Sequence, residues 1–118
     1  RDWLMSSRFF ITLPDPSAAR GSDSGLSFTA HGAEAFAREL LDALASPALF
    51  ERWRAQQEDP DGVDPHLGEI DPQAQVRAHQ TDLAIDLEVD TSLPGAILRQ
   101  RLRWLAGSAW QLRDVSGT

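Results

Sequence analysis

The sequence lacks four residue types that many active sites use. Its 118 residues include no cysteine, lysine, tyrosine or asparagine. These absences exclude a thiolate nucleophile, a lysine that forms a Schiff base or grips phosphate, a phenolic acid and an asparagine that orients a reacting water. They also exclude a disulfide framework and a CxxC motif. Chemistry is left to carboxylates, three histidines, serine, threonine and arginine, and no combination of these has a known catalytic spacing.

Long apolar runs and excess positive charge are also missing. No run of about 18 apolar residues is present, so no membrane-spanning helix is expected. Acidic residues outnumber basic ones by 18 to 11, for a net charge of −7. This balance disfavours phosphate-rich partners, so we expect neither nucleic acid nor an anionic membrane surface to bind. All the basic residues are arginine, which is typical of a GC-rich bacterial genome.

The beginning of the sequence has no long apolar segment of the kind found in a signal peptide. We therefore assign the protein to the cytoplasm. Met5 is a candidate for the natural start, which would make residues 1–4 a remnant of a tag or of upstream sequence.

The length predicts a single domain over residues 1–118, large enough to bury roughly two-thirds of its unfolded surface without a metal or disulfide. Hydrophobic content of 42% and charged content of 25% are ordinary for a globular protein. Residues 14–24 and 58–73 are rich in proline, glycine and polar side chains, and both predict loops. Whether the acidic loop 58–73 is ordered only on binding stays open at this level.

Apolar periodicity predicts the secondary structure. Alternation or β-branched runs predict strands at 8–13, 26–30, 76–78, 83–89 and 109–115. Helical spacing predicts one helix from about Gly32, a second over 47–57, and a third from a Ser92 cap to Gly107. The parity of apolar positions flips between Ala78 and Leu83, which requires a tight turn or a bulge near 80–82.

This order of elements predicts an α+β fold. We expect a two-layer sandwich, with a mainly antiparallel sheet that carries helices on one face. If the strand at 26–30 is minor, the remaining elements approximate a ferredoxin-like plait.

Three acids, Asp86, Glu88 and Asp90, alternate with apolar residues along one predicted strand, so they point to one face. Carboxylates at this spacing can bind a hard cation or serve as an acid/base pair. A solvated sheet face explains the same pattern, because water screens the repulsion between like charges, and we favour this interpretation.

No metal or cofactor site is expected. The acids of the 58–73 loop depart from the spacing of a calcium-binding loop, and its prolines restrict the wrap that a cation needs. The three histidines, His31, His66 and His79, are too far apart in sequence for a helical zinc site. His79 near Asp82 is the best-placed candidate for a general base, but a structural or exposed histidine is the interpretation that we favour.

The third predicted helix is locally basic. Arg99 and Arg103 stand four residues apart and therefore share a face, which could bind a carboxylate, a phosphate or an acidic partner surface. A solvated face that pairs with acids of the same molecule is the alternative. Trp104 beside Arg101 would mark an interface if it faces outward, because both residue types are enriched at binding hot spots.

We therefore predict a non-catalytic protein-interaction or regulatory domain that acts through a protein partner or through self-association as a homodimer. The predicted binding residues form a basic helix and an acidic strand face: Arg99, Arg101, Arg103, Trp104, Asp86, Glu88 and Asp90. The sequence favours no enzyme class.

The alternative is a small ligand-binding domain or an enzyme built on carboxylates and a histidine. It needs a pocket that brings His79 or His31 close to Asp82 or Asp86.

Overall fold

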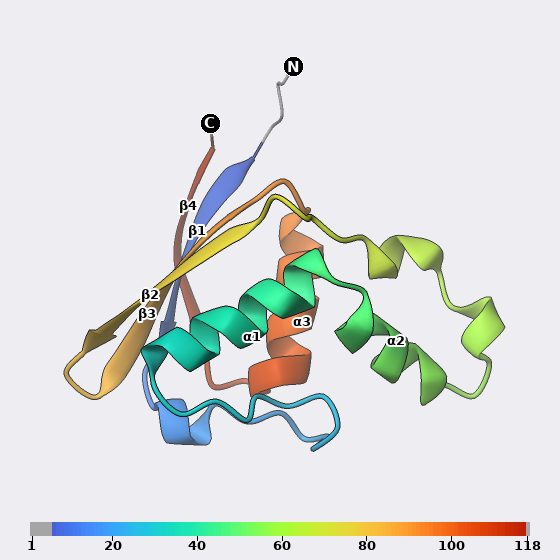
Figure 1. Cartoon of the computed structure of the whole chain (residues 1–118), viewed down its shortest axis with the longest axis horizontal. Helices are drawn as coiled ribbons and strands as arrows, with labels where there is room; N and C mark the ends of the chain where they lie inside the picture. The colour runs from blue at the N-terminus through green and yellow to red at the C-terminus, as the bar shows by residue number, and fades with distance from the viewer. Residues whose placement is uncertain (1–5, 118) are drawn as a thin grey trace.

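The computed structural model describes residues 6–117 and shows an α+β fold. Its strands are β1 (Ser7–Leu13), β2 (Gln75–Thr81), β3 (Ala84–Thr91) and β4 (Gln111–Gly117), and its helices are α1 (Ala33–Ala45), α2 (Ala48–Ala55) and α3 (Gly95–Ala106) (Figure 1). Short 3-10 turns occur at η1 (Pro16–Ala18), η2 (Pro60–Gly62) and η3 (Pro65–Gly68).

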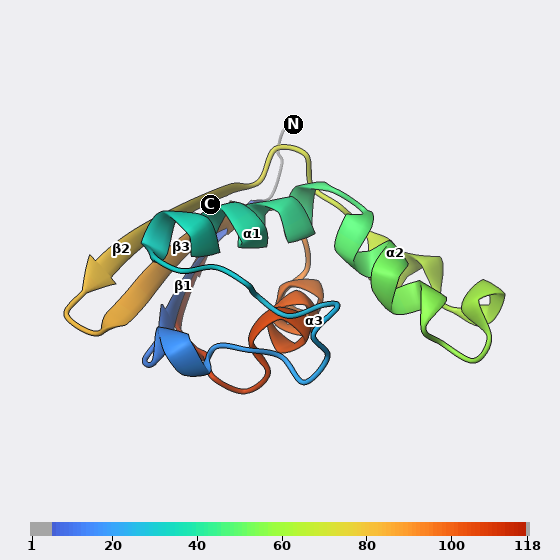
Figure 2. The same ribbon diagram turned by 60° about the horizontal axis from the view of Figure 1, so that its bottom comes forward.

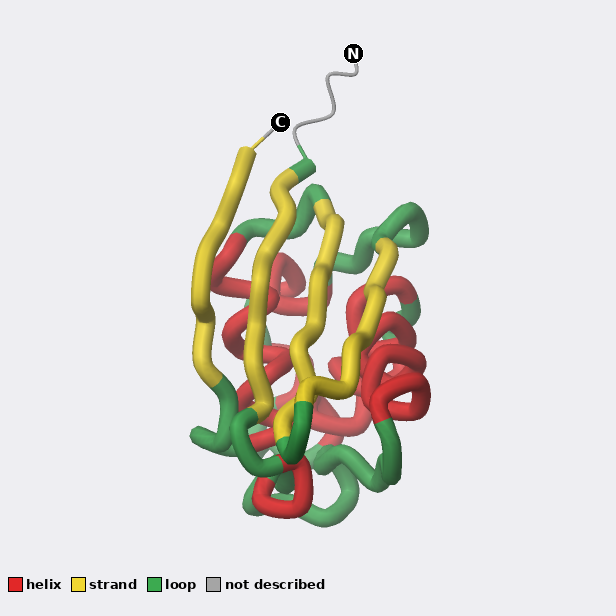
Figure 3. Tube along the Cα trace, turned by 90° about the vertical axis from the view of Figure 1, so that its left-hand side faces the viewer, coloured by secondary structure: helices red, strands yellow, loops and turns green. Residues whose placement is uncertain are grey.

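The four strands form one antiparallel sheet in the order β2-β3-β1-β4. Helices α1 and α3 lie on the same side of this sheet, whereas α2 and the turns that follow it extend away from it (Figure 2). The opposite face of the sheet carries no helix or loop among residues 6–117 (Figure 3). The expected α+β class and antiparallel sheet are confirmed.

The alternation of side chains in the central strands decides which face the helices cover. In β1, Phe9, Ile11 and Leu13 are buried, and the apolar positions of β3 are buried in the same way. They pack with the apolar stripes of α1 and α3 in one core. Full burial of each such side chain contributes roughly 1.5–3 kcal/mol, so this face is strongly specified.

The strand predicted at 26–30 is wrong. Leu26, Phe28 and Ala30 are buried alternately, as the pattern suggested, but the segment pairs with no strand. The Phe28 N–H instead donates to the carbonyl oxygen of Leu105 at the end of α3, at 2.8 Å. The Phe28 ring meets that of Phe36 edge-on, with centroids 4.9 Å apart. Alternation of apolar residues therefore indicates that one side of an extended segment is buried, and it does not by itself indicate pairing with another strand.

The predicted change of parity near 80–82 is a tight turn. Thr81 pairs with Ala84, which leaves a two-residue hairpin loop, and the register of β2 against β3 runs without interruption. Asp82 adopts φ of 59°, in the left-handed region that aspartate enters more readily than most residues.

The third helix begins later than predicted. α3 follows Pro94 without a side-chain cap, so Ser92 does not cap it. The Ser92 N–H instead donates to a carboxylate oxygen of Asp71 at 2.9 Å. The end of α3 agrees with the prediction, because Gly107 has φ of 64°, which favours glycine.

Asp71 joins three parts of the fold at the end of the 58–73 loop. Its buried carboxylate accepts hydrogen bonds from the Thr91 hydroxyl at 2.8 Å and from the N–H groups of Ser92 and Gln73, each at 2.9 Å. Its own N–H donates to the carbonyl oxygen of Leu44 at the end of α1, at 2.8 Å. One residue therefore fixes the loop to both layers.

Burial by itself raises the pKa of Asp71, but the hydrogen bonds from Ser92, Thr91 and Gln73 outweigh it and hold this pKa below the ordinary carboxyl value. Since the unfolded chain has the higher pKa, ionised Asp71 stabilises the fold above the ordinary carboxyl pKa. This contribution disappears as the pH falls through the lower pKa of the folded state.

We expect Asp71→Asn to lower the free energy of unfolding by about 1–3 kcal/mol at neutral pH, because the amide replaces one acceptor oxygen with a donor. The difference from the wild type should shrink below about pH 4. Urea unfolding at several pH values measures both effects, with the exposed Asp59→Asn as the control. A difference that stays constant with pH would contradict the assigned role of the ionised carboxylate.

Candidate functional site

The uncovered face of the sheet contains a hollow, which we call the sheet hollow. Its volume is about 590 Å³, within the range of small-molecule pockets. All four strands contribute to its lining, which includes Phe10, Thr12, His79, Asp86, Glu88 and Arg113. An apolar ring therefore lies among several groups that donate or accept hydrogen bonds.

Asp86 is the carboxylate that two neighbouring hydroxyls position in the sheet hollow. Its oxygens accept from the Thr12 hydroxyl at 2.7 Å and from the Thr81 hydroxyl at 3.1 Å. His79 lies directly opposite Asp86 in the β2–β3 pairing, so both side chains share this face. Among residues 6–117, no arginine forms an ion pair with Asp86. Asp86 therefore has no ion-pair partner in the sheet hollow, whose lining also includes His79 and Arg113.

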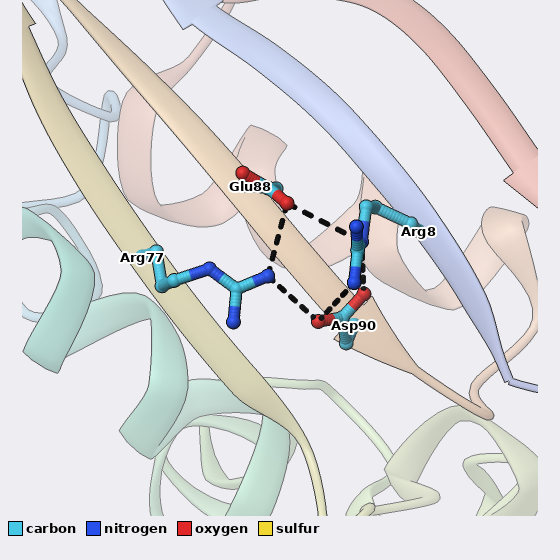
Figure 4. Close-up of polar contacts among 4 residues, drawn as sticks. All are labelled: Arg8, Arg77, Glu88 and Asp90. Atoms are coloured by element: carbon cyan, nitrogen blue, oxygen red, sulfur yellow. Dashed lines mark hydrogen bonds and ion pairs between the residues drawn. The ribbon is translucent and has the colours of Figure 1, made fainter.

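The other two acids of β3 are already neutralised by arginines of the neighbouring strands (Figure 4). Arg8 Nε lies 2.8 Å from an Asp90 oxygen and 3.3 Å from a Glu88 oxygen. On the other side, Arg77 Nη2 lies 2.9 Å from Glu88 and 3.2 Å from Asp90. Two cations and two anions thus form a network that has no net charge.

The same contacts perturb the arginines. The hydrogen bond to Asp90 raises the pKa of Arg8, and the hydrogen bond to Glu88 raises the pKa of Arg77. Both guanidiniums stay charged at any physiological pH. The three acids share one face, as the alternation predicts, but only Asp86 keeps the free charge that a partner could use.

On α3, the predicted basic residues do not form one surface. Arg99 and Arg103 are exposed, and neither makes a side-chain hydrogen bond or ion pair within the described part of the chain. Arg101 is 0% exposed and donates from Nη2 to the carbonyl oxygens of Leu67 at 2.9 Å and Glu69 at 3.0 Å. Arg101 therefore fastens the η3 segment to α3 and is not available to a partner on the surface with Arg99 and Arg103.

Trp104 faces α2 rather than solvent. It is half-buried, and its ring stacks on that of Trp53 with centroids 4.9 Å apart. The Arg101 guanidinium carbon lies 5.6 Å from the centre of the Trp104 ring. This arrangement is a packing contact between helices, so the condition under which Trp104 would mark an interface is not met.

Burial lowers the pKa of Arg101, while the nearby charge of Glu69 opposes that change. Among residues 6–117, its Nε and Nη1 atoms have no hydrogen-bond partner. A cation with only part of its hydrogen bonds satisfied is held in the core by the packing around it.

The remaining histidines are not assembled into a site. His31 and His66 are exposed, and His66 Nδ1 lies 3.7 Å from a Glu69 oxygen. Within residues 6–117, no group of histidine and acidic side chains could hold a metal ion. His79 therefore lies nearest to the geometry that the alternative function requires, with Asp86 rather than Asp82 as its pairing partner in the sheet.

Sequence reasoning missed several residues of the sheet hollow. The strand at 8–13 was predicted from its aromatic and β-branched residues, which did not show that Phe10 and Thr12 lie on the uncovered face. Arg8 lies 82 residues from Asp90 in sequence, so only the strand order reveals that pair, whereas Arg77 and Glu88 are 11 residues apart across the β2–β3 hairpin. The burial of Arg101 could have been predicted, because this residue continues the helical spacing of Leu98, Leu102 and Leu105.

Comparison of the chain with protein-family models, with curated proteins and with solved structures finds no match.

None of the helices within residues 6–117 has the length and hydropathy needed to cross a membrane.

We expect Arg101→Ala to lower the free energy of unfolding by about 3 kcal/mol, because it leaves two carbonyl oxygens unpaired and opens a cavity. Arg101→Met should lower it by less, since the longer side chain keeps most of the packing without burying a charge. Urea unfolding measures both variants. The control, Arg103→Ala on the exposed side of α3, should change stability by no more than about 0.5 kcal/mol. Equal effects of the two alanine variants would contradict a structural role for Arg101.

Proposed function

We propose that the protein is a non-catalytic interaction domain that acts through self-association, with the uncovered face of its sheet as the contact surface. The observation that carries this proposal is the sheet itself, which has helices on one face and the sheet hollow on the other. Half-buried Phe10 lies in this hollow and supplies an aromatic anchor of the kind that dominates interface energies.

The charge distribution also favours contact between two copies. The network of Arg8, Arg77, Glu88 and Asp90 has no net charge, and Asp86 shares the sheet hollow with Arg113, so two such faces meet without strong repulsion. The acidic strand is correspondingly a poor target for the exposed Arg99 and Arg103 of a second molecule. Face-to-face association is therefore better supported than pairing of a basic helix with an acidic strand.

The finer description of the fold belongs to the same proposal. A β-α-β-β-α-β order with β1 and β3 in the centre supports a two-layer, ferredoxin-like plait, if α2 is taken as an addition to the first crossover. A homodimer in a bacterial cytoplasm is consistent with the acidic composition and the absence of cysteine.

We expect Phe10→Glu to weaken self-association at least about tenfold, because it places a charge at the centre of the contact. Leu83→Glu is the matched control, since Leu83 is 83% exposed at the tip of the β2–β3 hairpin and outside the sheet hollow. Light scattering during size-exclusion chromatography, over a concentration series, measures the association. Melting curves show whether either variant has lost stability.

The double variant Arg99→Glu/Arg103→Glu separates the two modes of association. Face-to-face contact predicts that it associates as the wild type does, whereas docking of the basic helix predicts that it does not. A wild-type chain that stays monomeric at every concentration would contradict self-association by either route.

A second candidate function is the binding of a small ligand in the sheet hollow, with or without acid/base chemistry. The observation that favours it is the Asp86 carboxylate, held by Thr12 and Thr81 opposite His79. A general acid or base must reach its substrate directly or through one water, and a shared hollow meets that condition for both groups.

A thermal-melt screen against divalent metals, a chelator and a metabolite library tests this candidate. A ligand at a hundred times its dissociation constant should raise the melting midpoint by roughly ten degrees for a domain of this size. We expect Asp86→Asn to abolish most of such a shift, and Asp82→Asn, outside the sheet hollow, to retain it. If no compound shifts the melting curve, the ligand-binding candidate is wrong.

A further inference from the structure

The outer edge of β2 is free and regular. The strand pairs only with β3, from Gln75 to Thr81, without a register shift. Within residues 6–117, no hydrogen bond reaches the backbone groups on its other side. The opposite edge differs, because β4 pairs with β1 through an irregularity next to Phe10. A bulge of this kind hinders pairing with another chain, so β2 is the unprotected edge.

Helix α1 extends beyond the sheet at this edge, where it lies behind and beside β2 (Figure 3). A groove of about 510 Å³ separates the two elements, and we call it the edge groove. One face of α1 lines it with Glu34, Ala37, Arg38 and Leu41, so this helix contributes one acid and one base, and β2 lines it with residues 76–79. Ala37 and Leu41 are only half-buried, so the helix layer offers apolar surface that no strand covers.

A strand placed beside β2 would contact mainly apolar side chains on one face and polar side chains on the other. Its inward side chains would lie in the edge groove, on Ala37 and Leu41. Its outward side chains would lie next to Arg77 and His79 on the uncovered face. Within the described residues, every hydrogen bond and ion pair of the Arg77 side chain is made by Nη2, and His79 makes neither. Both side chains can therefore still donate to a carboxylate.

The molecule already contains one strand that satisfies these two requirements. β3 alternates the buried Ile85, Leu87 and Val89 with acids, and it places Glu88 against Arg77 at 2.9 Å. The free edge of β2 presents the same Arg77 and His79 on the other side. Side chains that suit one edge of β2 should therefore suit the other.

We propose that the edge of β2 accepts a fifth strand from a protein partner, an extended segment in which apolar and acidic residues alternate. Main-chain hydrogen bonds would supply affinity, and the edge groove with Arg38, Arg77 and His79 would supply specificity. This inference rests on the proposed function only in that the protein is an interaction domain, and it uses a different surface from the face-to-face contact.

A second copy of β2 is a poorer occupant. An antiparallel β2–β2 pair that keeps its apolar side chains in the two edge grooves places Arg77 opposite Arg77 of the second copy when the pairing is centred on that residue. Like charges directly opposite one another destabilise a strand pair. The acidic, alternating segment of a partner avoids this conflict.

The probe is a fluorescein-labelled peptide with the sequence of residues 84–91, titrated with the full chain and followed by fluorescence anisotropy. A second peptide, with lysine in place of its three acids, should bind at least about tenfold more weakly. We expect Arg38→Glu to weaken binding of the acidic peptide about threefold. Arg99→Glu is the matched control, because it makes the same charge reversal at an exposed arginine outside the edge groove, and it should bind as the wild type does.

Hydrogen exchange locates the bound peptide. Strand addition slows exchange of the amides in residues 75–81 and leaves those of β3 unchanged, whereas displacement of β3 by the peptide would expose β3 and overturn the proposal. Equal binding of the acidic and lysine peptides, or no binding of either, would also overturn it. Protection of residues 75–81 that grows with protein concentration before any peptide is added would identify a second copy as the occupant. None of these results depends on Phe10→Glu, so the edge proposal and the proposed function can fail separately.

Discussion

Burial on one side only of the β1–β3 pair determines how the rest of the molecule is arranged. Phe9, Ile11 and Leu13 and their partners in β3 point to the helices, so every alternate side chain must face the opposite way. Helices α1 and α3 cover the apolar side, α2 extends away from the sheet, and no element within residues 6–117 covers the other side. The sheet hollow, with Phe10, Asp86 and His79, is therefore a direct consequence of alternation in two strands rather than an independent feature.

That arrangement places three negative charges close together on β3, and arginines of the neighbouring strands reduce the repulsion between them. Three acids in one row of β3 repel each other, and the repulsion would favour another register or an unpaired strand. Arg8 and Arg77 flank this row and neutralise Glu88 and Asp90. The exposure of these pairs limits what each contributes to stability. They leave Asp86 without an ion pair on this face, to which Asp114, opposite Phe10 in the β1–β4 pairing, also belongs.

Local patterns predicted much of this fold, and long-range contacts account for the rest. The strand at β3, the apolar face of α1 and the end of α3 at Gly107 follow from spacing and from the conformational freedom of glycine. The structure of the 26–30 segment could not be predicted in this way, because a buried extended segment and a paired strand show the same alternation of apolar residues. Strand order was equally inaccessible, and the contacts of Arg8 with Glu88 and Asp90 depend on it. The burial of Arg101 could have been predicted from helical spacing, but its charge favoured the prediction of a surface position.

The edges of the sheet extend the same reasoning to partner binding. A helix layer must be wide enough to cover its sheet, but here α1 reaches past β2 and leaves Ala37 and Leu41 without a strand above them. Half-buried Ala37 and Leu41 lie beside a strand edge whose outward backbone groups make no hydrogen bond within residues 6–117, and an open edge of this kind favours pairing with another chain. An added strand would satisfy both at once, which neither a ligand in the sheet hollow nor contact through the uncovered face can do. The β2 edge is thus the place where one partner would complete both layers of the fold.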